Sequence, residues 1–122
     1  MSEARHQVVL VEDDLGMREA IQRVLTGGGF EVTGFESAEA ALQDHRTLNA
    51  RCLVLDIRLP GLSGFEMYER LVAVGRKPPV IFITARDNAS HHERAMRLGA
   101  LGFLLKPFPG RELSALVAKA FA

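Results

Sequence analysis

The sequence predicts an α/β fold in which five parallel strands form a doubly wound sheet with five helices. Three observations support this prediction. Short apolar runs alternate with segments of helical periodicity five times along the 122 residues. The connecting segments are short, which favours right-handed crossovers between parallel strands. Most of the strand-like runs are apolar throughout, as expected where helices cover both faces of a sheet.

The first half of the chain supplies two strands and two helices. The apolar run 8–11 is predicted as the first strand, and apolar residues over 17–25 recur at helical spacing until three glycines end that helix. Residues 30–35 alternate as a strand near a sheet edge does. Ser37 is predicted to cap an alanine-rich helix that runs to about Thr47.

The second half repeats the pattern three times. Strands are expected at 52–56, 80–83 and 103–105. Three helices are marked by apolar residues at helical spacing: Phe65, Tyr68, Leu71 and Val72; Met96 and Leu98; and Leu113, Leu116, Val117 and Ala120. Gly75 and Gly99 are predicted to end the first two of these helices.

The composition indicates one ordinary folded domain with a sizeable core. Hydrophobic residues make up 48% of the chain, and 15 basic side chains balance 15 acidic ones, so the net charge gives no general attraction to nucleic acid or membrane. No targeting segment precedes the first strand, and no apolar run approaches the roughly 20 residues of a membrane span. We therefore expect a cytoplasmic domain that binds neither membrane nor nucleic acid directly. The single cysteine, Cys52, is expected to pack as a small hydrophobe.

Polar side chains stand at the ends of four predicted strands. Glu12 and Asp13 follow the first strand, and Asp56 ends the third. Thr84 follows the fourth strand and Lys106 follows the fifth. In an open α/β sheet, ligands bind outside the carboxyl ends of the strands. The sequence therefore predicts one site at which acids, a hydroxyl and an ammonium meet.

These residue types suit phosphoryl transfer to a carboxylate. Neighbouring carboxylates repel one another unless a cation intervenes, and an all-oxygen cluster suits Mg²⁺, with Mn²⁺ as a second candidate ion. A carboxylate such as Asp56 can act as a nucleophile toward a phosphoryl group. Lys106 and Thr84 could then neutralise the phosphoryl oxygens. Because the ammonium would matter chiefly once a phosphoryl group is present, Lys106→Met is expected to leave folding stability nearly unchanged or to raise it slightly.

Four segments with this chemistry stand in order along the chain: residues 11–14, 55–61, 83–85 and 103–108. On these segments the chain resembles the receiver domain of bacterial two-component response regulators of the chemotaxis-regulator type, over essentially its whole length. The resemblance implies one receiver domain over residues 1–122, with a flavodoxin-like sheet of strand order 2-1-3-4-5.

The resemblance also implies roles for the acidic residues and the loop that follows the third strand. Asp56 would be the phosphoacceptor and Asp13 a direct metal ligand. Glu12 would orient a metal-bound water, and the backbone carbonyl of Arg58 would be the third protein ligand. Asp14 directly follows the acid pair, so a register shifted by one residue stays open as an alternative.

A switch is implied by the same resemblance. Thr84 would move toward the phosphoryl group, and Phe103 would rotate inward behind it, changing the surface around the fourth helix, fifth strand and fifth helix. Phe103 as a plain core residue is the alternative. The peptide bond between Lys106 and Pro107 would be cis.

The implied partner is a sensor histidine kinase that phosphorylates Asp56 in a Mg-dependent reaction. The domain would catalyse only its own phosphorylation and dephosphorylation, and so would not be an enzyme for other substrates. Phosphorylation could drive homodimerisation. Either the receiver stands alone, or an effector domain follows it; the loop at 56–64 is similar to that of regulators with a helix-turn-helix output, which hints at transcription regulation.

Two other functions fit the pattern less well. An aspartyl-phosphate-forming phosphatase of haloacid dehalogenase type needs an acid two residues after its nucleophile, where this chain has Arg58. Flavodoxin-like FMN binding needs a hydroxyl-rich phosphate loop after the first strand, where this chain carries acids that would repel a phosphate.

The predicted fourth helix carries two features with other possible readings. His91 and His92 are interpreted as part of a solvated face, without a third metal ligand nearby. Arg86, Arg94 and Arg97 are interpreted as a basic patch that docks a partner protein, because no DNA-recognition motif accompanies them.

Overall fold

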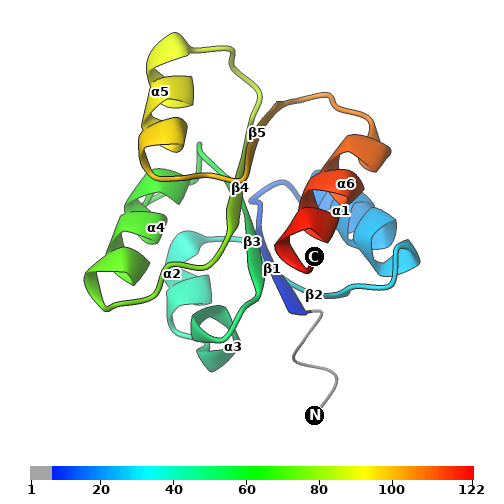
Figure 1. Ribbon diagram of the computed structural model, residues 1–122, viewed down its shortest axis with the longest axis horizontal. Coiled ribbons are helices and arrows are strands. Elements are labelled where there is room, and N and C mark those ends of the chain that lie inside the picture. Colours follow the sequence, from blue (N-terminus) through cyan, green and yellow to red (C-terminus); the bar gives the residue numbers. More distant parts are fainter. Residues whose placement is uncertain (1–6) are drawn as a thin grey trace.

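A parallel five-stranded sheet forms the centre of the computed structural model, which describes residues 7–122 (Figure 1). The strands are β1 (Gln7–Val11), β2 (Glu31–Phe35), β3 (Cys52–Asp56), β4 (Val80–Thr84) and β5 (Gly102–Leu105). Their order is β2-β1-β3-β4-β5, which confirms the predicted fold class and strand order. The expectation that no targeting segment precedes the first strand concerns residues 1–6, which lie outside the described residues.

Six helices cover the two faces of the sheet (Figure 1). One face carries α1 (Leu15–Gly27) and α6 (Gly110–Ala120); the other carries α2 (Ala38–Leu42), α3 (His45–Leu48), α4 (Gly64–Ala73) and α5 (Ala89–Arg97). Successive side chains of a strand point to opposite faces, so each buried strand contributes side chains to the apolar layer on each side of the sheet. Within residues 7–122, no helix is long and apolar enough to cross a membrane.

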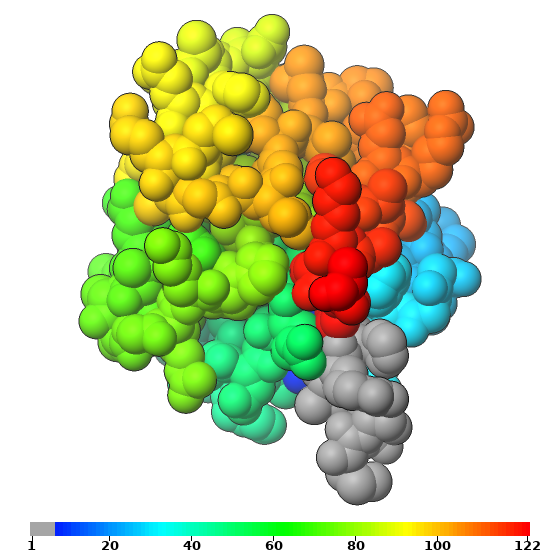
Figure 2. Space-filling model, viewed as in Figure 1, coloured from blue at the N-terminus to red at the C-terminus, as the bar shows by residue number. Residues whose placement is uncertain are grey.

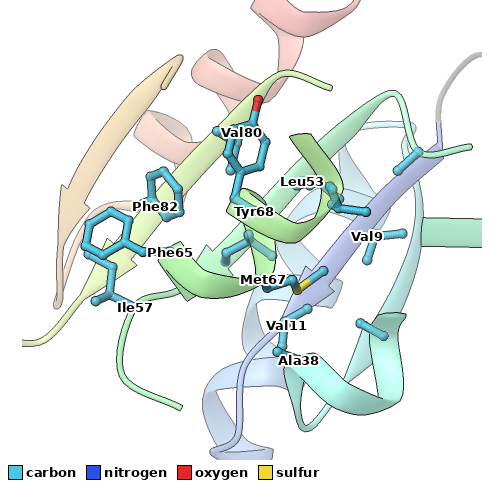
Figure 3. Close-up of a cluster of buried hydrophobic side chains, with 14 of the residues drawn as sticks. Val9, Val11, Ala38, Leu53, Ile57, Phe65, Met67, Tyr68, Val80 and Phe82 are labelled. Atoms are coloured by element: carbon cyan, nitrogen blue, oxygen red, sulfur yellow. The ribbon is translucent and has the colours of Figure 1, made fainter. Parts of the chain in front are cut away.

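The layer beneath α4 is built around aromatic rings (Figure 3). The ring of Phe82 in β4 lies 4.7 Å from that of Phe65 and 6.0 Å from that of Tyr68, measured between centroids. The Tyr68 hydroxyl donates a hydrogen bond of 2.7 Å to the backbone carbonyl of Pro78. Phe65 and Tyr68 thus pack α4 against β4. The Tyr68 hydroxyl, a polar group within this apolar layer, is satisfied by its hydrogen bond to Pro78.

The predicted single helix after Ser37 is wrong in its extent, because the chain forms two short helices there. Ser37 caps α2 as predicted, accepting a hydrogen bond of 3.1 Å from the Ala40 N–H. Asp44 then starts α3 by accepting from the Arg46 N–H at 2.9 Å, and its carboxylate also pairs with the Arg46 guanidinium. The buried Thr47 hydroxyl donates to the Ala41 carbonyl and ties the two helices together. Residues 7–122 therefore form six helices instead of the expected five.

The end of β3 is packed tightly against the start of α4. Gly64 is buried, and a Cβ atom at this position would collide with the backbone carbonyl of Asp56. The Gly64 N–H also donates to the Ile57 carbonyl at 3.1 Å. Glycine is therefore required where α4 begins, because no side chain fits between the helix and the strand end. At the end of β5, the Lys106–Pro107 peptide bond is cis, as the resemblance implied.

We expect Cys52 to be unreactive in the folded protein. The residue is completely buried, and burial raises the pKa of its thiol to about 12. Thiolate, the reactive form, is therefore scarce in the native state even at pH 8 to 9. A thiol-reactive disulfide reagent should label Cys52 rapidly in denaturant and only at the rate of unfolding in buffer. Fast labelling of the folded protein would contradict the buried position.

Candidate functional site

The carboxyl ends of β1, β3, β4 and β5 bring the predicted polar residues to one edge of the sheet. In the strand register, Val11 pairs with Leu55, Asp56 with Ile83, and Thr84 with Leu105. Glu12, Asp13 and Asp56 each have a carboxylate oxygen within 4.8 Å of the others. The structure therefore assembles the acid cluster that the strand pattern predicted.

Lys106 connects the two buried carboxylates of this cluster. Its Nζ lies 2.6 Å from Glu12 Oε1 and 2.9 Å from Asp56 Oδ2. The Glu12 and Asp56 side chains are only 1% and 5% exposed, so water contributes little to their solvation. Burial raises the pKa of the Glu12 carboxyl despite the opposing effect of Lys106. Burial alone would lower the pKa of Lys106, but its hydrogen bonds to both acids raise it overall.

The three consecutive acids after β1 have separate environments. Both oxygens of Glu12 already accept hydrogen bonds, one from Lys106 and one from the Asp14 N–H at 3.0 Å. Asp14 Oδ2 accepts from the Met17 N–H at 2.8 Å and so caps α1. Asp13 is exposed, and within residues 7–122 no hydrogen bond or ion pair engages its carboxylate. Its oxygens therefore remain available to a ligand, whereas Asp14 serves the helix.

Asp56 and Thr84 are held by the backbone of the loops that follow them. Asp56 Oδ1 accepts a hydrogen bond of 3.0 Å from the Arg58 N–H, so each oxygen of this carboxylate has a different donor. The fully buried Thr84 hydroxyl accepts from the Arg86 N–H at 3.2 Å. Accepting this bond leaves the hydroxyl hydrogen free to be donated elsewhere.

A cavity of about 540 Å³ opens beside the acid cluster. It is lined by Asp13, Ile57, Arg58, Leu59, Pro60, Ser63, Phe65, His91 and Arg94. The lining combines one acid of the cluster, the loop after β3, and the inner side of α5. The lining therefore includes two basic residues, Arg58 and Arg94, besides the acid Asp13.

The interpretation of His91 as part of a solvated face is wrong. Helix α5 stands at the surface (yellow in Figure 2) and buries a single residue completely, Ala95. His91 nevertheless packs its ring 5.7 Å from that of Phe65, and its Nδ1 is buried without a hydrogen-bond partner. His92 is exposed, as expected, although its ring lies 5.1 Å from that of Phe103.

Arg94 is not a free member of a basic patch. Its Nη2 lies 3.0 Å from both carboxylate oxygens of Glu69 in α4, and its guanidinium lies 4.7 Å from the centre of the Phe65 ring. These contacts could not be predicted from local sequence patterns, because Arg94 and Glu69 are 25 residues apart and belong to different helices. Arg86 and Arg97 are exposed and could still take part in docking.

Phe103 lies in β5, partly buried against the layer beneath α4. This partial burial fits both alternatives for Phe103: a fixed core residue, or a ring that rotates when the domain is switched. The contact with His92 shows that the Phe103 ring lies against α5.

Comparison with known proteins identifies this arrangement. The family model of the response regulator receiver domain matches residues 8–118. This chain belongs to that family. The receiver domain acts in two-component signalling, and its relatives include transcriptional regulators. Family membership does not favour the phosphatase alternative.

Individual relatives agree with this membership. Nodulation protein W of Bradyrhizobium diazoefficiens is 42% identical over 106 residues, which cover 87% of this chain and 47% of the relative. The transcriptional regulatory protein FixJ of the same organism is 35% identical, with coverages of 93% and 55%. The solved structure of the response regulator StyR is 40% identical with a TM-score of 0.85, and the match covers 94% of this chain and 58% of that one. The receiver chain thus spans about half the length of the curated relatives.

The geometry of Lys106 changes the expectation for Lys106→Met. Removing the ammonium leaves two buried carboxylates without a cation, so we expect the free energy of unfolding to fall at pH 8 in EDTA by roughly 3–5 kcal/mol, as for other broken buried pairs. A proton on Glu12 can replace the lost charge, and the folded state binds that proton more tightly than the unfolded chain does. The stability of the variant should therefore decrease as the pH rises from 4.5, the ordinary pKa of Glu12, through the raised folded value.

Urea unfolding from pH 5 to pH 8 measures this dependence. Lys77→Met, at an exposed lysine, is the matched control and should follow the wild type. Equal stability of Lys106→Met and wild type at pH 8 would restore the expectation drawn from the sequence.

Proposed function

We propose that this receiver domain is switched by phosphorylation of Asp56. The observation that carries the proposal is the setting of this carboxylate, which is buried at a strand end with Lys106 Nζ 2.9 Å from one oxygen and the Arg58 N–H 3.0 Å from the other. A carboxylate held in this way can act as a nucleophile. The donor would be the phosphohistidine of a sensor histidine kinase.

The proposed transfer forms one bond and breaks another at phosphorus. An Asp56 oxygen bonds to phosphorus as the bond from phosphorus to the donor nitrogen breaks, and the donor imidazole leaves with that electron pair. In hydrolysis, water attacks phosphorus, the bond to Asp56 breaks, and inorganic phosphate is released. The domain would thus catalyse only its own phosphorylation and dephosphorylation.

Lys106 and Thr84 would neutralise the transferred phosphoryl group. The Lys106 ammonium already lies against Asp56 and could exchange part of that pairing for a phosphoryl oxygen. The Thr84 hydroxyl retains its hydrogen and could donate it to another oxygen. Thr84 ends β4 and Lys106 directly follows β5, so both groups stand at the edge of the sheet where the phosphoryl group would form.

The acid cluster suits a hard divalent cation, and we propose Mg²⁺, with Mn²⁺ as the alternative ion. All of its donors are oxygens, and they lie within 4.8 Å of one another. Asp13, whose carboxylate has no partner among the described residues, and Asp56 would be direct ligands together with the backbone carbonyl of Arg58, while Glu12 would orient a bound water. The cation would supply positive charge that offsets the repulsion between these carboxylates and a phosphoryl group.

The switch would connect the strand ends to α5. Thr84 ends β4 and leads through residues 85–88 into α5, and Phe103 in β5 lies against His92 of the same helix. Movement of Thr84 and Phe103 toward the phosphoryl group would therefore alter the surface formed by α5, β5 and α6. An effector domain or a second copy of the chain would read that change. We also propose that residues 1–122 form one receiver domain, since the family match leaves few of them outside.

Asp56 should be the residue that becomes phosphorylated. With Mg²⁺ and acetyl phosphate, intact-mass measurement should show the gain of one phosphoryl group, and Asp56→Asn should abolish it. Asp44→Asn is the control, because asparagine can still cap α3 and the site is untouched. Labelling of Asp56→Asn equal to wild type would rule out this acceptor.

Asp13 and Asp14 should differ sharply in their effect on the metal. Asp13→Ala removes a direct ligand and should weaken Mg²⁺ binding by at least about tenfold, the lower bound seen for supporting residues around metals. Asp14→Ala should instead lower stability by about 1 kcal/mol through the lost cap of α1, with little change in Mg²⁺ affinity. Amide chemical-shift titrations and urea unfolding measure the two effects. The opposite order of affinities would show that the register is shifted by one residue.

A further inference from the structure

The loop between β3 and α4 forms one wall of the cavity beside Asp56. Residues 58–60 and Ser63 line this cavity, and the loop carries the Arg58 carbonyl that we assign to the metal. The ends of the loop are anchored by the backbone: the Arg58 N–H donates to Asp56, and the Gly64 N–H donates to Ile57. Between these anchors the loop must be held in some other way.

Glu39 supplies that support from a different part of the chain. Its Oε2 accepts a hydrogen bond of 2.8 Å from the Leu62 N–H, 23 residues away in sequence. Among the described residues, no other hydrogen bond joins the middle of the loop, residues 59–62, to the rest of the protein. The Leu59 and Leu62 side chains pack against the layer beneath α4, but apolar packing alone does not fix the direction of a backbone carbonyl.

Gly61 shows how closely the Glu39 carboxylate approaches the loop backbone. Its φ of +75° lies in the left-handed region, which favours glycine. A Cβ atom at this position would also collide with the Glu39 carboxylate. The Glu39 carboxylate therefore lies in direct contact with the loop backbone at Gly61, in the space that a side chain there would occupy.

We propose that Glu39 is a positioning residue, which holds the 58–63 loop so that the Arg58 carbonyl and the wall of the cavity face the acid cluster. This inference rests on the proposed metal-dependent function of the site. Glu39 belongs neither to the acid cluster nor to the lining of the cavity, so it acts through the loop. The hydrogen bond from Leu62 lowers the pKa of its carboxyl, so the group carries its charge at neutral pH.

Variants of Glu39 separate positioning from folding. Glu39→Ala removes the acceptor and should weaken Mg²⁺ binding by roughly three- to tenfold, somewhat less than the loss of a group bonded directly to a ligand. Glu39→Gln keeps an amide oxygen that can accept from Leu62, so its affinity should lie close to the wild type. Glu36→Gln is the control, because Glu36 is an exposed acid that precedes the same helix and, among the described residues, has no hydrogen-bond partner.

Gly61→Ala gives an independent test. The added methyl group should displace the Glu39 carboxylate and so weaken Mg²⁺ binding as Glu39→Ala does. In the double variant the collision is absent and only the strain at the positive φ of residue 61 remains, so the combined loss of affinity should be smaller than the sum of the two separate losses. Amide chemical shifts report Mg²⁺ affinity, and hydrogen exchange of the Leu62 amide, measured without metal, should become faster in Glu39→Ala.

The outcomes distinguish this inference from the proposed function. Wild-type affinity in Glu39→Ala, with Asp13→Ala still impaired, would overturn the positioning role and leave the proposed function intact. Additive effects of Glu39→Ala and Gly61→Ala would also overturn it. Failure of the wild-type domain to bind Mg²⁺ would overturn both. Weakened binding in Glu39→Ala that Glu39→Gln restores, with unchanged urea midpoints, would support the positioning role.

Discussion

Two carboxylates that are almost completely buried, those of Glu12 and Asp56, share a single ammonium group from Lys106. Charges in this position are tolerated only when they are paired and hydrogen-bonded. The three residues come from the ends of β1, β3 and β5, so the pairing requires the sheet to be assembled in its observed order. The pairing of these buried charges therefore depends on a hydrogen bond between residues 12 and 106, which are 94 positions apart, the widest separation of any side-chain hydrogen bond among the described residues.

Backbone groups constrain the strand end at Asp56 and the loop that follows it. Gly64 allows α4 to begin against the strand, and the Arg58 N–H holds one oxygen of the carboxylate. The loop between these two residues is supported by Glu39 from α2. Each of these constraints acts on a main-chain group, and two of them require glycine, at positions 61 and 64.

The strands and their polar ends could be predicted because the signal is local. A buried parallel strand is apolar throughout, and a charged residue directly after it marks the edge at which ligands bind. Asp56, Thr84 and Lys106 are each recognised by this change from apolar to polar. The separate environments of Asp13 and Asp14 could not be predicted, because both acids follow the same strand and only the start of α1 distinguishes them.

The features that escaped prediction depend on contacts between distant segments. The break between α2 and α3 is stabilised by the buried bond from Thr47 to Ala41, whereas the local alanine content favours one continuous helix. The partial burial of His91 and the pairing of Arg94 arise only when α5 packs on α4. In the sequence, Glu39 is an ordinary acid in the first turn of a helix. Its hydrogen bond with Leu62, 23 residues away, forms only in the folded protein.

The position of Tyr68 determines what intrinsic optical signals can report. The chain has no tryptophan and one tyrosine, so ultraviolet emission comes almost entirely from Tyr68. That ring is buried between α4 and β4, with its hydroxyl bound to Pro78 on the loop before β4. Its emission will therefore follow the disruption of the layer beneath α4. Events at the carboxyl ends of the strands will reach it only if they change the packing of this layer.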